Sequence, residues 1–148
     1  MVTELIAILA LIASAINVIL YGVLQKKCNA IAQMQTLIGQ GALETQVRSE
    51  IANTASEVRR WAAELSKNPK DGTLKKIYAS AAEAYRNAYE DACAKYIDGK
   101  IDTKRFEKMY KTEIYNLVNS DAQKDFYASN QTTYVSTTKV YKQWFAQE

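Results

Sequence analysis

The chain has 148 residues, a formal net charge of +3, five glycines and one proline, which is typical of one small, mostly helical domain. It has no histidine, so the most common general base and transition-metal ligand is missing, and its two cysteines are too far apart in sequence for a metal-ligand spacing or a disulfide framework. Since it also has no glycine-rich phosphate loop, we expect no metal, no cofactor and no enzyme activity, and the small net charge does not indicate binding of double-stranded nucleic acid.

The first apolar segment, LIAILALIASAINVILYGVL, covers residues 5–24 without a charged side chain. A helix of this length spans the roughly 30 Å core of a bilayer. No Lys or Arg precedes it, which disfavours a cleaved signal peptide. We therefore predict a transmembrane helix over residues 1–25. Because Lys26 and Lys27 follow it, the positive-inside rule places the rest of the chain in the cytoplasm.

Small and polar side chains form one stripe along this segment, at alternating steps of three and four residues. The stripe includes Ala10, Ser14 and Asn17. Small residues let helices approach closely, and an Asn within a membrane donates a hydrogen bond to a neighbouring helix. We therefore predict a homo-oligomer; the alternative is a lone helix that tolerates one Asn. The same steps continue to Ile38 and predict a juxtamembrane stalk over residues 26–41, which Gly39 and Gly41 loosen.

The remainder, residues 42–148, shows helical periodicity and no strand pattern. Turn residues and helix caps divide it into about four helices. The last of these contains several Thr residues and is expected to be interrupted near Ser129 and Asn130. The predicted fold class is all-α, with one N-terminal transmembrane helix followed by a cytoplasmic bundle of about four helices. The expected helices begin near Leu43, Thr73, Asp102 and Ser120.

The stretch YIDGKIDTKRF, between the second and third of these helices, contains part of an EF-hand pattern. With Gly99 at the invariant position 6 of that loop, Ala94, Tyr96 and Arg105 fall on positions 1, 3 and 12, none of which then supplies the required oxygen ligand. We interpret the stretch as a turn. Gly99 ends one helix in the left-handed conformation, and Asp102 caps the next.

The helix after Asp102 carries a basic face. Its candidate ligand-binding residues are Lys104, Arg105, Lys108, Lys111 and Tyr115. Such a face is usually only the solvated side of a helix. In an oligomer, however, several copies of the face would form a strong site for an anionic, phosphate-bearing ligand.

Ten tyrosines are present, and several recur seven residues apart, as Tyr89 and Tyr96 do. Seven residues are about two helical turns, so each set lies on one face. Tyr fills a helix–helix or subunit contact while its hydroxyl keeps a polar partner, and it also stacks on nucleobases. The spacing does not separate these two interpretations.

The segment LIAILALIASAINVILYGVLQKK followed by a helical, Tyr- and Lys-rich part resembles small bacterial single-span membrane proteins of phage defence. Among these it is similar to the membrane effectors of type III CRISPR systems, whose soluble domain binds cyclic tetra-adenylate and forms an oligomer. The resemblance covers the whole chain in outline and includes no diagnostic motif. It implies an oligomeric antiviral defence effector in the bacterial inner membrane.

Under this resemblance, the cytoplasmic domain would bind a cyclic oligoadenylate and thereby perturb the lipid bilayer. The basic face described above would hold the phosphates, and Tyr would stack on adenine. The alternative is a non-enzymatic membrane scaffold that recruits a protein partner through its Tyr-rich helical domain.

Overall fold

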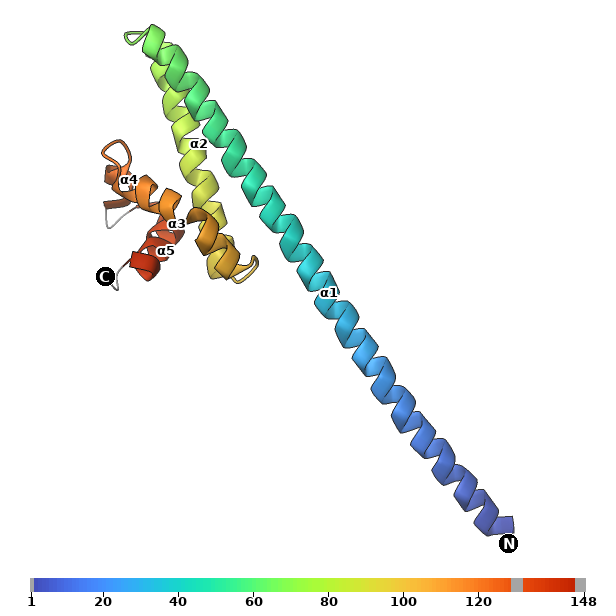
Figure 1. Cartoon of the computed structure of the whole chain (residues 1–148). Coiled ribbons are helices and arrows are strands. Elements are labelled where there is room, and N and C mark those ends of the chain that lie inside the picture. The colour runs from blue at the N-terminus through green and yellow to red at the C-terminus, as the bar shows by residue number, and fades with distance from the viewer. Residues whose placement is uncertain (1, 129–131, 146–148) are drawn as a thin grey trace. The chain divides into compact units, whose positions relative to one another are not determined.

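The computed structural model describes the backbone of residues 2–128 and 132–145, and the side chains of this range except 2–13 and 15. Within these residues every regular element is an α-helix, which confirms the all-α prediction (Figure 1). The helices are α1 (Val2–Lys67), α2 (Gly72–Ile97), α3 (Thr103–Asn119), α4 (Lys124–Ala128) and α5 (Val135–Phe145).

The predicted membrane placement is wrong. In the described part of the chain, no helix has the length and apolar character that crossing a membrane requires. The expected single-pass localisation in the inner membrane is therefore wrong, whereas the bilayer as a partner stays a prediction.

The chain divides into two compact units, residues 1–39 and residues 40–148. Helix α1 continues through Gly39 and Gly41, where the sequence predicted that the helix loosens. A glycine inside a helix costs only about 1 kcal/mol relative to alanine, which a long helix tolerates.

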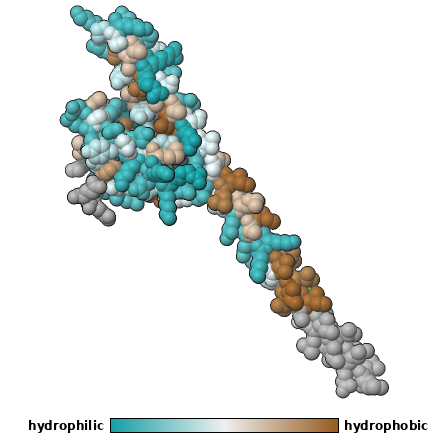
Figure 2. Space-filling model, viewed as in Figure 1, coloured by the Kyte–Doolittle hydropathy of each residue, from teal (hydrophilic) through white to brown (hydrophobic). Residues whose placement is uncertain are grey.

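The N-terminal unit is one helix whose described side chains are exposed. Ser14 and Asn17 are exposed, and Ala10 lies outside the described side chains. Large apolar side chains are also exposed, from Ile16 to Ile38, and Figure 2 shows hydrophobic patches on the described part of this unit. The unit therefore presents apolar surface that no other part of the same unit covers.

The C-terminal unit is built around the second half of α2. Small side chains there, such as Ala88 and Ala92, are buried and let α5 pack closely against α2. Helix α3 contacts both α4 and α5. Aromatic rings fill the space between helices, with Tyr96 at 5.4 Å from both Phe106 and Trp144 by ring centroids. The core is therefore largely aromatic.

The buried tyrosines settle the interpretation of the seven-residue spacing. Five of them belong to the core, namely Tyr89, Tyr96, Tyr110, Tyr127 and Tyr134. The hydroxyl of Tyr96 accepts a hydrogen bond from Trp144 Nε1 at 3.1 Å, and that of Tyr134 accepts one from Arg86. Most Tyr faces are therefore core, as the helix–helix interpretation expects.

The turn between α2 and α3 is as predicted. Gly99 has φ of 65°, and the bonds from Gly99 N to Tyr96 O and from Lys100 N to Lys95 O end α2 in a Schellman motif. Asp102 caps α3 by accepting from Arg105 N at 2.9 Å. At the start of α2 the cap is Asp71, close to Thr73, where the sequence placed the beginning of this helix.

The last part of the chain forms two helices, α4 and α5, with residues 129–131 between them outside the described range. The start of α5 is fixed by Glu90 of α2. Its carboxylate accepts hydrogen bonds from Ser136 N at 2.7 Å and from Thr137 N at 2.9 Å. A carboxylate at this position satisfies N–H groups that a helix start leaves unpaired.

Candidate functional site

Helix α3 presents the basic face because its other side is held in the core. Phe106, Tyr110, Ile114 and Leu117 are buried and recur at helical spacing. The opposite side is left at the surface, where Lys104, Lys108 and Lys111 line a depression of about 470 Å³ together with Glu107 and Thr112. The structure thus brings together three of the predicted ligand-binding residues.

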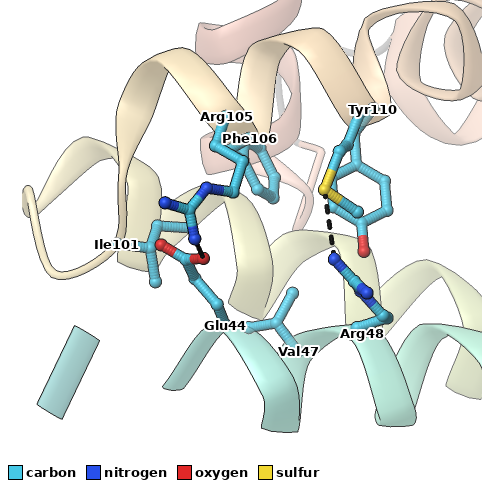
Figure 3. A pocket seen from close by; sticks show the side chains of 8 residues that line it. Glu44, Val47, Arg48, Ile101, Arg105, Phe106 and Tyr110 are labelled. Atoms are coloured by element: carbon cyan, nitrogen blue, oxygen red, sulfur yellow. Dashed lines mark hydrogen bonds and ion pairs between the residues drawn. The ribbon is translucent and has the colours of Figure 1, made fainter. Parts of the chain in front are cut away.

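Arg105 lies apart from this face. Its Nη1 is 2.7 Å from Glu44 Oε2 in α1, and its Nη2 is 3.8 Å from Asp102 Oδ2. Figure 3 shows the guanidinium turned toward Glu44, at a cavity that Val47 and Phe106 also line. That cavity is about 20 Å³, room for about one water molecule. Arg105 therefore holds α3 to the part of α1 in this unit and has little charge to offer a ligand.

The three lysines differ in what surrounds them. Lys111 Nζ is 3.4 Å from Glu107 Oε1 and 5.3 Å from the centre of the Phe145 ring. Lys104 and Lys108 are exposed, and neither has an ion pair among the described residues. An exposed ammonium without a carboxylate partner binds phosphate as a point charge. These two lysines are therefore the strongest anion contacts on the face.

Tyr115 continues the face into an aromatic patch. Its ring is 6.3 Å from that of Tyr141 and 5.3 Å from that of Phe145 by centroids, and Tyr115 is 47% exposed. The hydroxyl of Tyr141 and the side chain of Asn119 also hydrogen bond to each other. An exposed ring held by two others is a surface on which a planar base can stack.

Sequence reasoning found the lysines and Tyr115 but not their aromatic neighbours. Tyr141 and Phe145 come from α5, and only the packing of α5 on α3 brings them to Tyr115. A seven-residue spacing, which Tyr134 and Tyr141 also have, indicates a shared helix face, yet it carries no information about which helix that face contacts.

Helix α3 therefore offers two kinds of contact along one face. Lysine amines at one end suit phosphates, and an aromatic ring at the other end suits a base. Comparison with protein-family models, curated proteins and solved structures finds no match for this chain. The resemblance to phage-defence effectors therefore stays a prediction.

Proposed function

We propose that the C-terminal unit binds a phosphate-bearing nucleotide on the α3 face, and that its ligand is a cyclic oligoadenylate of antiviral defence. The observation that carries this proposal is the exposed Tyr115 ring on the same helix face as Lys104 and Lys108. The phosphates contact the amines and an adenine stacks on Tyr115. The protein acts as a non-enzymatic effector, and the membrane step expected from the sequence is not part of this proposal.

The dimensions of the face agree with a ligand that has several phosphates. Lys104 and Lys111 are seven residues apart, roughly 10 Å along a helix axis. A ligand with phosphates about this far apart can contact both amines without either side chain bending toward the other. A cyclic oligonucleotide carries phosphates around a ring, so it can contact more than one lysine and, in an assembly, more than one copy of the face.

We also propose that the N-terminal unit self-associates. Tyr21, Leu24, Ile31 and Ile38 are exposed, and with Cys28 and Gln35 they follow the three-and-four steps of a coiled-coil seam. A second copy of the same helix supplies a matching seam and buries these side chains. The homo-oligomer predicted from the sequence is proposed again in this form, through packing of two copies of the exposed seam.

The ligand proposal is tested by calorimetry on the whole chain with cyclic tetra-adenylate and with AMP. We expect the cyclic ligand to bind more tightly, and the binding to weaken with salt because the contacts are charged. Lys104→Glu with Lys108→Glu should abolish the heat, whereas Lys75→Glu with Lys76→Glu, the same charge change on exposed residues of α2, should not. Tyr115→Ala should weaken binding by about 1–3 kcal/mol.

No heat with the cyclic ligand at tens of micromolar would sink the effector proposal. It would favour the alternative of a scaffold that recruits a protein partner. Binding that survives the α3 double substitution would move the site, first toward the groove that Lys139 and Lys142 line with Tyr127.

The self-association proposal is tested by light scattering during dilution. Ile31→Asp with Ile38→Asp places charges in the seam and should lower the molar mass to that of the monomer. Asn29→Asp with Gln33→Asp adds the same charge on the other side of the helix and should leave the mass unchanged. A monomeric wild-type chain, or equal masses for the two double variants, would contradict the seam.

A further inference from the structure

Arg86 of α2 is a largely buried cation that makes no ion pair with a described residue. The residue is 6% exposed. Its Nε donates to the Tyr134 hydroxyl at 3.1 Å and its Nη1 donates to Gln123 Oε1 at 2.9 Å, and both acceptors are neutral. Among the described residues, no carboxylate oxygen lies within 4.0 Å of the guanidinium. Burying a charge without a counterion is costly, so this arrangement needs an explanation.

The carboxylate one turn further along α2 is already occupied. Glu90 accepts from Ser136 N through one oxygen, and from Thr137 N and Thr137 Oγ1 through the other. Its bonds are therefore made with the start of α5. The guanidinium has five N–H donors, and the described side chains accept from two of its nitrogens only.

A second donor beside Arg86 is also unmatched. Tyr127 is 5% exposed, and its hydroxyl is buried without a hydrogen-bond partner among the described residues. Its ring centre is 5.2 Å from that of Tyr134, the same Tyr134 whose hydroxyl contacts Arg86. Burial raises the pKa of Tyr127, the nearby charge of Arg86 opposes that rise, and the more weakly acting charge of Glu90 adds to it, so the hydroxyl keeps its proton and remains a donor.

The cluster is thus rich in donors and short of acceptors. The ring of Phe126 lies over the guanidinium, 3.8 Å from its centroid to Arg86 Cζ, and Phe126 itself is 45% exposed. The guanidinium is therefore shielded by a residue at the surface and lies only one side chain from solvent.

We propose that Arg86 and Tyr127 bind a small oxyanion, the carboxylate or phosphate group of a ligand. A planar guanidinium presents paired N–H donors that match the two oxygens of such a group, and the Tyr127 hydroxyl supplies a further hydrogen bond. The anion provides the missing counter-charge and the missing acceptor together. This site is separate from the α3 face and does not depend on the function proposed for it.

Thermal unfolding of the whole chain tests the site, with chloride replaced stepwise by phosphate or by acetate at constant ionic strength and pH 7. We expect a saturable rise in Tm with at least one of the two oxyanions, because a ligand that binds the folded state stabilises it. A rise with phosphate only, with acetate only, or with both identifies the bound group. No rise with either overturns the proposal.

Phosphate also stabilises proteins without binding them, so variants decide whether the rise is specific. Arg86→Met replaces the cation with an apolar side chain of similar length, and it should remove the saturable rise. Lys139→Met with Lys142→Met removes two surface cations near Tyr127 and should keep it. A rise that persists in Arg86→Met overturns the proposal.

Tyr127→Phe is a second variant that tests the site by the same measurement if Arg86→Met does not fold. It removes one hydroxyl that has no partner, so the fold should be retained. The concentration of oxyanion needed for half of the Tm rise should increase roughly tenfold, as expected for the loss of one hydrogen bond to a charged group. An unchanged half-point overturns the role of Tyr127 and, with it, the proposed site.

Discussion

The two units of this chain are both rich in apolar residues, but the described side chains of this kind are exposed in the N-terminal unit and largely buried in the C-terminal unit. In the N-terminal unit, described side chains such as Leu24 and Ile31 are 61% and 58% exposed. In the C-terminal unit, side chains of the same kind, such as Ile101 and Ile114, are 2% and 0% exposed. The difference shows that apolar content alone does not decide burial. A helix buries its apolar side only where another element of the same chain, or of another copy, is in place to cover it.

The two cysteines offer the strongest test of this difference, because one lies in each unit. Cys28 is exposed and Cys93 is buried. Burial raises the pKa of the Cys93 thiol from its ordinary value of 9.0 to about 12, against a lowering by its hydrogen bond with Thr137. At pH 8 Cys93 is therefore both covered and protonated, and the thiolate is the reactive form.

Labelling with a thiol reagent at pH 8 should show one fast and one very slow reaction. We expect Cys93 to react at least about 10³-fold more slowly than in the unfolded chain, since it must wait for the core to open. Cys28→Ser should remove the fast reaction, and urea should make the slow one fast. A rapid reaction of Cys93 in the folded Cys28→Ser variant would show that the core of the C-terminal unit opens readily.

The raised pKa of Cys93 also sets a pH dependence with a definite sign. The unfolded chain loses this proton near pH 9, and the folded chain only near pH 12. Between these values the folded state binds more protons, so the stability contributed by the neutral thiol falls as pH rises. Cys93→Ala should remove that part of the fall, which urea unfolding at pH 8 and pH 10 would measure.

The helices and the α2–α3 turn could be predicted because local rules decide them. The spacing of Phe106, Tyr110 and Ile114 defines a buried helix face whatever covers it, and Gly99 supplies the left-handed residue that ends α2. The membrane span could not be judged in this way, because an apolar helix that packs on another helix has the same composition as one that packs on lipid.

The candidate sites depend more on contacts between distant residues. The α3 lysines were predicted, since a helix face is a local property. The ion pair of Arg105 with Glu44 and the patch of Tyr115 with Phe145 join residues far apart in sequence, and no spacing encodes them. Arg86 was missed for the same reason, because a cation on an Ala-rich helix looks like a surface residue until Phe126 and Tyr134 cover it.

The C-terminal unit is also held together by polar contacts between its helices. Substituting Glu90, which makes such contacts, should have the smallest of the expected effects. Its carboxylate holds three hydrogen bonds at the start of α5, so α5 is fastened to α2 by charge as well as by packing. Glu90→Gln keeps the size of the side chain but removes the charge. One of the two accepting oxygens becomes an amide N–H₂ group, which cannot accept a hydrogen bond from the N–H donor that faces it. We expect a loss of about 1–3 kcal/mol in the free energy of unfolding.

Glu83→Gln is the matched control, because Glu83 is exposed on the same helix and exposed substitutions usually change stability by less than about 0.5 kcal/mol. Urea unfolding followed by circular dichroism measures both variants, with an unchanged slope showing that the two-state comparison holds. If Glu90→Gln is no more destabilising than Glu83→Gln, the start of α5 does not depend on this carboxylate. Apolar packing of Trp144 and Val140 would then be what holds α5 in the C-terminal unit, since both side chains are buried there.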